Sequence, residues 1–179
     1  MPPTPACQVR RVDYRDPKDA AALVTLLDLY AQDPMGGGAP LAQDVKARLC
    51  ADLAERSNHG AVSFIAWNRV NAANAVEALN GDAKPVGLLN AFEAYSTFKA
   101  RPLLNIHDLA VHPEHRGQGV GQALLAAVAQ HAKERGCCKL TLEVLSGNTV
   151  ALKSYARFGF AGYQLDPTAG QAVFLQKWL

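Results

Sequence analysis

The sequence lacks the features that mark membrane, secreted and nucleic-acid-binding proteins. It has no apolar run near the roughly 18 residues of a membrane-spanning helix. Its first six residues, Met-Pro-Pro-Thr-Pro-Ala, lack the basic and apolar blocks of a secretory signal. The net charge is only +2, and the 18 basic residues are scattered instead of forming a stripe. These absences predict a cytoplasmic protein that has no membrane or nucleic-acid partner and acts on small molecules.

Cysteine is scarce, and the motifs of two common classes of site are missing. The four cysteines, Cys7, Cys50, Cys137 and Cys138, show no zinc spacing, and a bridge between the last two would be strained. We therefore expect reduced, structural thiols. The Gly-x-Ser-x-Gly elbow of a serine hydrolase does not occur either.

The residues that are present predict one α+β domain over 1–179, because 179 residues with 49% hydrophobic content can bury a sizeable core. Apolar alternation and helical spacing place a sheet with helices on both faces. We expect strands at 8–14, 62–67, 85–95, 103–111, 139–145, 161–165 and 172–178, and helices at 17–30, 41–56, 119–135 and 148–158. Asp16 and Pro17 mark the first helix start. The 71–82 connector is longer than a tight turn needs.

The most informative segment runs from Leu109 to Leu125 and reads LAVHPEHRGQGVGQALL. It joins an apolar strand to a helix through a turn in which Gly117, Gly119 and Gly121 remove side chains, so that backbone N–H groups can converge on phosphate oxygens. Arg116 adds a positive charge there. The glycine spacing is not that of the dinucleotide pattern, and the Gly-Lys-Ser/Thr of a Walker A motif is absent.

This pattern, Arg-x-x-Gly-x-Gly preceded by Leu-x-Val-x-Pro, resembles motif A of the GNAT superfamily of N-acetyltransferases. A second pattern, Asn148, Ala151, Tyr155 and Gly159-Phe160, follows the 139–145 strand and resembles motif B. The resemblance implies a mixed, mainly antiparallel central sheet and acetyl-CoA as cosubstrate, with no metal. The residues it assigns to the cofactor are Leu109, Ala110, Val111, Arg116, Gly117, Gln118, Gly119, Val120, Gly121, Gln122, Asn148 and Tyr155.

Two side chains of motif B have a catalytic and a structural interpretation. The resemblance makes Tyr155 the acid that protonates the sulfur of CoA, since a phenol stays protonated at neutral pH. The alternative is an aromatic residue packed on the sheet. Asn148, seven residues earlier on the same helix face, either binds the pantetheine arm or caps the helix.

His107 is the candidate base, because an imidazole can accept a proton from an ammonium group near neutral pH. The alternative is an imidazole that is hydrogen-bonded within the sheet. His107 is expected on the strand face of Leu109, with Asp108 on the opposite face unless a bulge intervenes. Glu93, on the preceding strand, is a second candidate base. Glu93, His107 and Asp108 are the expected substrate-binding residues.

The predicted reaction is direct transfer of an acetyl group from acetyl-CoA to a small primary amine within a ternary complex. Candidate acceptors are a diamine, an amino acid or an aminoglycoside-like amine. The segment Tyr95-Ser96-Thr97-Phe98 is similar to the diamine and polyamine acetyltransferase branch, although His107 stands where that branch usually has Glu. The alternatives are an acetyltransferase of protein N-termini or lysines, and a non-catalytic CoA-binding regulatory module.

Two further expectations concern the histidines of the turn and the C-terminus. His112 and His115 either touch phosphate or are solvated, and no acidic or cysteine partner is expected at ligand spacing around them, so no metal site is predicted. Members of the superfamily frequently dimerise, sometimes by exchanging their last strands. The segment 173–179 is apolar enough to permit such a homodimer.

Overall fold

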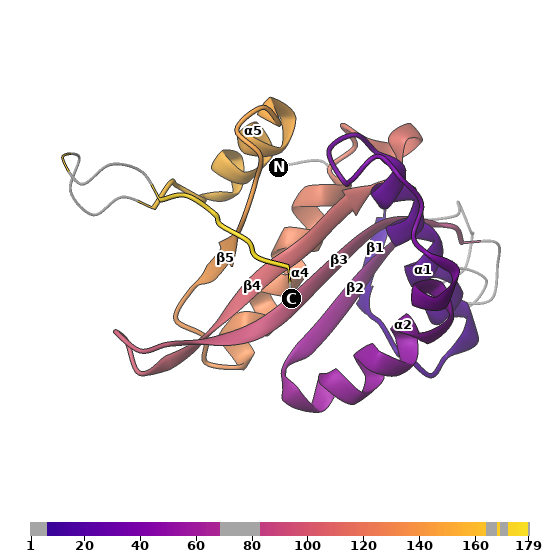
Figure 1. The fold of residues 1–179 in the computed structure, drawn as a ribbon, viewed down its shortest axis with the longest axis horizontal. Coiled ribbons are helices and arrows are strands. Elements are labelled where there is room, and N and C mark those ends of the chain that lie inside the picture. The colour runs from indigo at the N-terminus through magenta and orange to yellow at the C-terminus, as the bar shows by residue number, and fades with distance from the viewer. Residues whose placement is uncertain (1–6, 69–82, 164–167, 169–171, 179) are drawn as a thin grey trace. The chain divides into compact units, whose positions relative to one another are not determined.

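A computed structural model describes residues 7–68, 83–163, 168 and 172–178 (Figure 1). It forms two compact units, residues 1–142 and 143–179. The first unit holds the sheet and most of the helices, and the second holds one helix and the C-terminal segment. A single domain over 1–179 stays a prediction, and the 71–82 connector lies outside the described residues.

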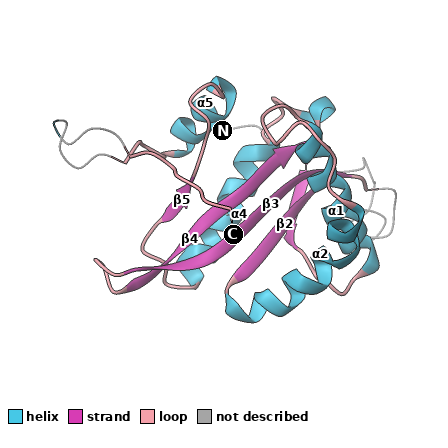
Figure 2. Cartoon of the chain, in the orientation of Figure 1, coloured by secondary structure: helices cyan, strands magenta, loops and turns pink. Residues whose placement is uncertain are grey.

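The sheet has five strands in the order β1-β2-β3-β4-β5 (Figure 2). The strands span Cys7–Arg11, Ala61–Asn68, Pro85–Ser96, Arg101–Val111 and Leu140–Leu142. The first four pair antiparallel, and β5 pairs parallel with β4. This arrangement confirms the predicted mixed, mainly antiparallel sheet. β5 is shorter than the predicted 139–145 strand.

Helices cover both faces of the sheet, as predicted. Helices α1 (Pro17–Gln32) and α2 (Gln43–Arg56) pack on one face, where Ile65, Trp67 and Leu88 join their core. Helix α4 (Val120–Glu134) packs on the other, and its side chains approach Gly87 of β3 so closely that a Cβ there would lie 2.8 Å from Val120 Cγ1. We call these the α1 face and the α4 face. No helix of the described part of the chain is long and apolar enough to cross a membrane.

The start of α1 follows the prediction closely. The Asp16 carboxylate accepts the Asp19 backbone N–H at 2.8 Å, and Pro17 occupies the first helical position. The side chain of Asp19 is buried, and it forms an ion pair with Arg10 of β1 and accepts the Asp13 N–H at 3.0 Å. The guanidinium of Arg10 also lies over the Trp67 ring, so these contacts tie α1 to the edge of the sheet.

The second unit contains helix α5 (Thr149–Phe158), which ends at Gly159 in a left-handed conformation. The predicted strands at 161–165 and 172–178 are wrong for the residues that the structure describes, because 161–163 and 172–178 form no strand. Apolar alternation gives a strand only where another strand supplies backbone partners, and Phe174 and Trp178 are exposed here. The homodimer stays a prediction.

Candidate functional site

The turn between β4 and α4 is held by backbone hydrogen bonds at its start and is open at its glycines. His112 N–H donates to the Val86 carbonyl of β3 at 2.9 Å, and a 3-10 turn, η2 (Pro113–His115), follows. Gly117 and Gly119 have φ of 76° and 83°, and a Cβ at either would meet nothing within 4 Å. The glycines therefore provide the left-handed backbone conformation and leave the space above the turn clear.

Helix α4 begins without a side-chain cap. Its N-cap is Gly119, which supplies no side-chain cap hydrogen bond, and the first turn has no acidic residue. The first-turn N–H groups of a helix have no intrahelical acceptor, and the helix dipole adds partial positive charge at this end. The N-terminus of α4 thus has the properties of an anion-binding site.

Arg116 was expected to add a positive charge to this turn, but its charge is paired within the protein. Its Nη2 donates to Asp33 Oδ2 at 2.9 Å, and its Nε donates to the Val111 carbonyl at 3.2 Å. Asp33 is the C-cap of α1. The Met35 N–H and then Arg116 lower the pKa of Asp33. Arg116 therefore connects the turn to the end of α1.

Among the described strands, β4 is paired with β3 alone over its last residues before the turn. Its ladder with β5 covers only 104–106 against 140–142, whereas its ladder with β3 continues to Val111. In the part of the chain that the structure describes, the edge of 107–111 facing away from β3 has no strand partner. Backbone groups of Leu109, Ala110 and Val111 therefore lie along an edge that β5 does not cover.

A β-bulge in β4 brings His107 and Asp108 to the same face. Asp108 is opposite Asn90 and Ile106 is opposite Ala91, so His107 is the extra residue. The His107 ring lies edge-on to Phe92, with centroids 5.7 Å apart, and Phe92 packs against the core of the α1 face. Opposite faces were expected for His107 and Asp108 unless a bulge intervened, and because the bulge is present the two residues share one face.

Leu109, in contrast, lies on the α4 face. A Cβ at Gly121 of α4 would be 3.8 Å from its Cδ2. The expected alignment of His107 with Leu109 is therefore wrong, because the bulge interrupts the two-residue period of the strand. The segment 107–109 presents polar side chains toward α1 and apolar side chains toward α4.

A buried chain of hydrogen bonds leads to Asp108. Tyr14 OH donates to Ser63 Oγ at 2.9 Å, Ser63 donates to Asn90 Oδ1 at 2.6 Å, and Asn90 Nδ2 donates to Asp108 Oδ2 at 2.9 Å. Ser63 and Asn90 are 1% and 3% exposed. Burial raises the pKa of Tyr14, so its phenol remains a donor. The chain fixes the orientation of the Asp108 carboxylate.

Tyr30 completes the surroundings of this carboxylate from α1. Burial, the charge of Asp108 and the charge of Asp33 raise the pKa of Tyr30. Sequence reasoning missed Tyr30 and the three residues of the hydrogen-bond chain. Polar Ser63 and Asn90 within apolar strands were the available signal, because a buried polar side chain requires a partner.

Glu93 lies apart from these groups. Its carboxylate accepts from Arg135 Nη2 at 3.0 Å, just after the end of α4. A Cβ at Gly60 would lie 2.4 Å from Glu93 Cβ, so the backbones approach closely there. Glu93 therefore belongs to the α4 face, whereas His107 and Asp108 belong to the α1 face.

In the second unit, Asn148 Oδ1 accepts the Ala151 N–H at 3.1 Å and caps α5. The structural interpretation of Asn148 is confirmed, and this contact leaves a role toward the cofactor untested. The Tyr155 ring lies edge-on to Phe160, with centroids 5.8 Å apart. Tyr155 thus packs within its own unit, and its role as an acid stays a prediction.

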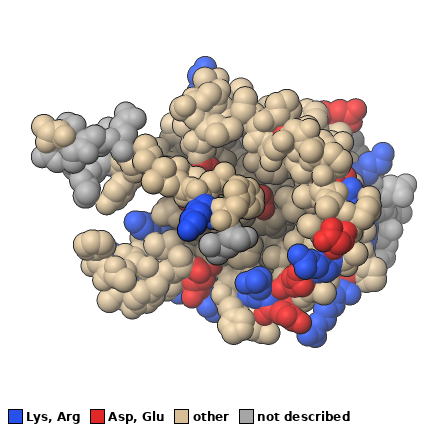
Figure 3. Space-filling view, in the orientation of Figure 1, with Lys and Arg blue, Asp and Glu red and all other residues tan. Residues whose placement is uncertain are grey.

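None of the four cysteines forms a disulfide in the described structure. Burial raises the pKa of the Cys50 and Cys137 thiols. The protonated form is therefore favoured over the nucleophilic thiolate. The charged side chains around α2 are mixed in sign on the face shown in Figure 3, where basic and acidic groups alternate.

The family model described as "Acetyltransferase (GNAT) family" matches residues 43–160. Streptothricin acetyltransferase of Streptomyces lavendulae is 42% identical over 87 residues, 49% of this chain and 46% of that protein. Thialysine N-epsilon-acetyltransferase of Bos taurus is 41% identical over 66 residues, 37% of this chain and 38% of that protein. The chain thus spans less than half the length of these curated relatives.

Solved structures share the fold over nearly the whole chain. AAC(6')-Iy in complex with the bisubstrate analog CoA-S-monomethyl-acetylneamine has a TM-score of 0.70 and covers 97% of this chain, with 99% of its own chain covered. The sequence identity is 17%, so this likeness concerns the fold alone.

Proposed function

Because the chain belongs to the acetyltransferase (GNAT) family, we propose that it transfers the acetyl group of acetyl-CoA to a primary amine of a small molecule. The observation that carries the proposal is the uncapped N-terminus of α4 beneath an open glycine turn. Backbone N–H groups and a helix dipole suit a pyrophosphate there. The relatives named for streptothricin and thialysine support an amine of small size.

The residues that we assign to the cofactor lie on three backbone segments. The turn from Arg116 to Gln122 binds the pyrophosphate, and the free edge of Leu109 to Val111 binds the pantetheine arm and the acetyl carbonyl. Asn148 contributes from α5. Bound acetyl-CoA supplies an activated thioester, and hydrogen bonds from the strand N–H groups would polarise its carbonyl.

The acceptor amine must lose a proton before its nitrogen can attack the carbonyl carbon. We assign the removal of this proton to His107 and Asp108, which share the α1 face. His107 lies beside Phe92, and Asp108 is hydrogen-bonded to Asn90. Asp108 holds the ammonium group of the incoming substrate, and His107 accepts the proton directly or through water. As the new C–N bond forms and the C–S bond breaks, Tyr155 donates its phenolic proton to the sulfur.

The test is release of CoA thiol from acetyl-CoA across a panel of diamines, amino acids, aminoglycosides and short peptides. We expect amine-dependent release in the wild type and a loss of about 100-fold or more in Tyr155→Phe, within the usual range for a general acid. Tyr163→Phe is the matched control, since Tyr163 is 65% exposed. His107→Ala and Asp108→Asn should each lower kcat, with a changed pH profile for His107→Ala.

Two outcomes would contradict the proposed transfer to a small-molecule amine, and a third would contradict only the assigned acid. Turnover of peptides alone would indicate a protein acetyltransferase. Tight binding of acetyl-CoA with no turnover on any amine would indicate a regulatory CoA-binding module. Full activity in Tyr155→Phe would remove the assigned acid while leaving the acetyl transfer itself in place.

A further inference from the structure

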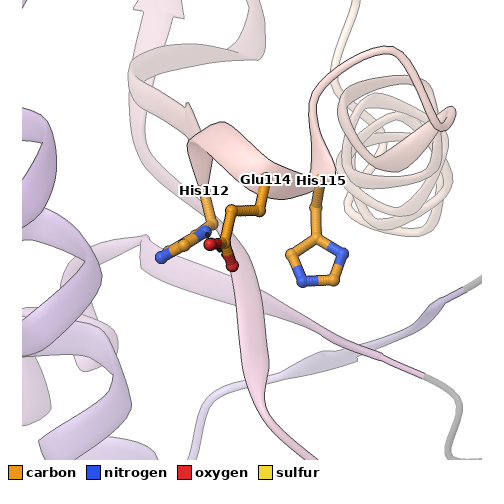
Figure 4. A group of neighbouring side chains, drawn as sticks. All are labelled: His112, Glu114 and His115. Atoms are coloured by element: carbon orange, nitrogen blue, oxygen red, sulfur yellow. Dashed lines mark ion pairs between the residues drawn. The ribbon is translucent and has the colours of Figure 1, made fainter.

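Three potential metal ligands meet on the short turn that follows β4. His112, Glu114 and His115 each offer one ligand atom, and these atoms all lie within 4.8 Å of one another (Figure 4). The expectation that no acidic partner stands at ligand spacing around the two histidines is wrong, because Glu114 does. We propose that these three side chains form a binding site for a first-row transition metal ion such as Zn²⁺.

The donor set is that of a catalytic or regulatory zinc site. Two imidazole nitrogens and one carboxylate oxygen suit Zn²⁺, and three protein ligands leave a fourth position for water or another ligand. A purely oxygen-based set would instead favour Mg²⁺ or Ca²⁺. The chemistry of the cluster therefore selects the class of ion.

An unsatisfied nitrogen provides a second, independent observation. His112 Nδ1 is buried and has no hydrogen-bond partner in the described structure, although a buried polar atom normally has one. Glu114 Oε2 lies 4.0 Å away, which is beyond hydrogen-bond distance. A metal ion between these two atoms would satisfy both.

The backbone of the turn holds the ligands in place. His112 N–H donates to the Val86 carbonyl, and His115 N–H donates to the His112 carbonyl, both at 2.9 Å. Pro113 fixes φ at the first position of the 3-10 turn. The ligands are thus presented by a short segment anchored to the sheet.

Small side-chain movements would complete the coordination. Two ligands of one tetrahedral zinc ion lie roughly 3.4 Å apart, given bonds of about 2.1 Å. The ligand atoms must therefore approach by little more than an ångström. The Glu114 side chain is 82% exposed, so it can rotate without disturbing the core. The ion would then lie beside Arg116, whose own charge is paired with Asp33.

The test uses the full chain and the metal ion alone, and it does not depend on acetyl transfer. Calorimetric titration with Zn²⁺, with the thiols kept reduced, should show one saturable site. Glu114→Gln and His115→Ala should each weaken binding by about tenfold or more, since even loss of an outer-shell partner costs that much. His59→Ala is the matched control, an exposed histidine elsewhere in the unit.

Cysteine is the competing ligand and is tested separately. The double variant Cys137→Ser with Cys138→Ser should bind Zn²⁺ as the wild type does. Bound Co²⁺ should show ligand-field absorption without a thiolate charge-transfer band. The proposal is overturned if no saturation occurs up to on the order of 100 µM Zn²⁺, if His115→Ala binds normally, or if the cysteine variant loses binding.

Discussion

The N-termini of α1 and α4 lie in the same unit and are built in opposite ways. At α1, Asp16 caps the helix and the buried Asp19 lies in its first turn, so side chains of this chain occupy the positive end of the dipole. At α4, Gly119 is the cap, and neither a capping side chain nor an acidic residue is present in the first turn. A side chain thus accepts a first-turn N–H group at α1, whereas no N-cap side chain does so at α4.

The difference separates the contribution of a helix N-terminus to stability from its contribution to binding. A capped terminus stabilises the fold, whereas an open one gives up that stabilisation and keeps its N–H groups for an anionic ligand. Figure 1 shows the two helices on different sides of the sheet, so each end can be altered without touching the other. Substitutions at the two ends should therefore affect different measurements.

The largest effect on stability is expected from Arg10→Ala. Asp19 would remain buried without its cation, and breaking such a pair typically lowers the free energy of unfolding by about 3 kcal/mol or more. Urea denaturation measures the change. Arg11→Ala, an exposed neighbour on β1, is the control. A loss below about 1 kcal/mol would mean that the pair behaves as an exposed one.

Gly119→Asp should place a negative charge at the open terminus. A carboxylate at this position would repel the pyrophosphate, lowering the affinity for CoA by on the order of 100-fold, or about 2.7 kcal/mol. Calorimetric binding of CoA measures it. Unchanged affinity in a folded variant would show that CoA does not bind at α4.

Asp16→Ala makes the reverse change at α1. Loss of the cap should lower the free energy of unfolding by about 1 kcal/mol and leave CoA binding unchanged. Thermal unfolding and CoA titration of the same sample give both values. If the affinity for CoA falls along with the stability, the two termini are not independent.

Gly121→Ala should show whether the ligand needs the space on the β4 side of the turn. A methyl group here would contact Leu109 and Val111 at 3.8 Å and point toward β4, away from the open side of the turn. We expect a gain of about 0.5 kcal/mol in stability and normal CoA binding. A marked loss of affinity would place the ligand nearer the sheet than we propose.

A second small effect concerns the pair between Arg116 and Asp33. The folded state lowers the pKa of Asp33, so the pair contributes stability above the unfolded-state pKa and loses it as pH falls through the lowered value. The wild type should therefore exceed Asp33→Asn in stability near neutral pH, by at most about 1 kcal/mol. This difference should vanish in strong acid, and unfolding curves across the acidic range follow it. A difference that persists in acid would assign it to a cause other than the charge of Asp33.

Local features of the fold were predictable from the sequence, because their causes are local. The cap at Asp16, Pro17 after it and the glycine turn after β4 depend on a few neighbouring residues, and the structure confirms each. The bulge at His107 is different. No residue type near it signals an extra residue, so its consequence for the faces of His107 and Asp108 required the paired strand.

The remaining differences arise from contacts between distant segments. Arg116 lies on the turn and Asp33 at the end of α1, and nothing in either segment indicates their pairing. The two C-terminal segments alternate as strands do, but alternation does not supply a partner strand. Glu114 was visible beside His112 and His115, and only the geometry of the 3-10 turn brings the three ligand atoms together.

The most direct test of the account is the change in backbone amide NMR signals as CoA is added to the ¹⁵N-labelled protein. The account predicts that the largest shifts fall on residues 117–122, while the amides of 17–20 at the capped start of α1 stay in place. Comparable shifts at both helix starts, or saturable binding that leaves 117–122 unchanged, would contradict the assignment of the open α4 terminus as the pyrophosphate site.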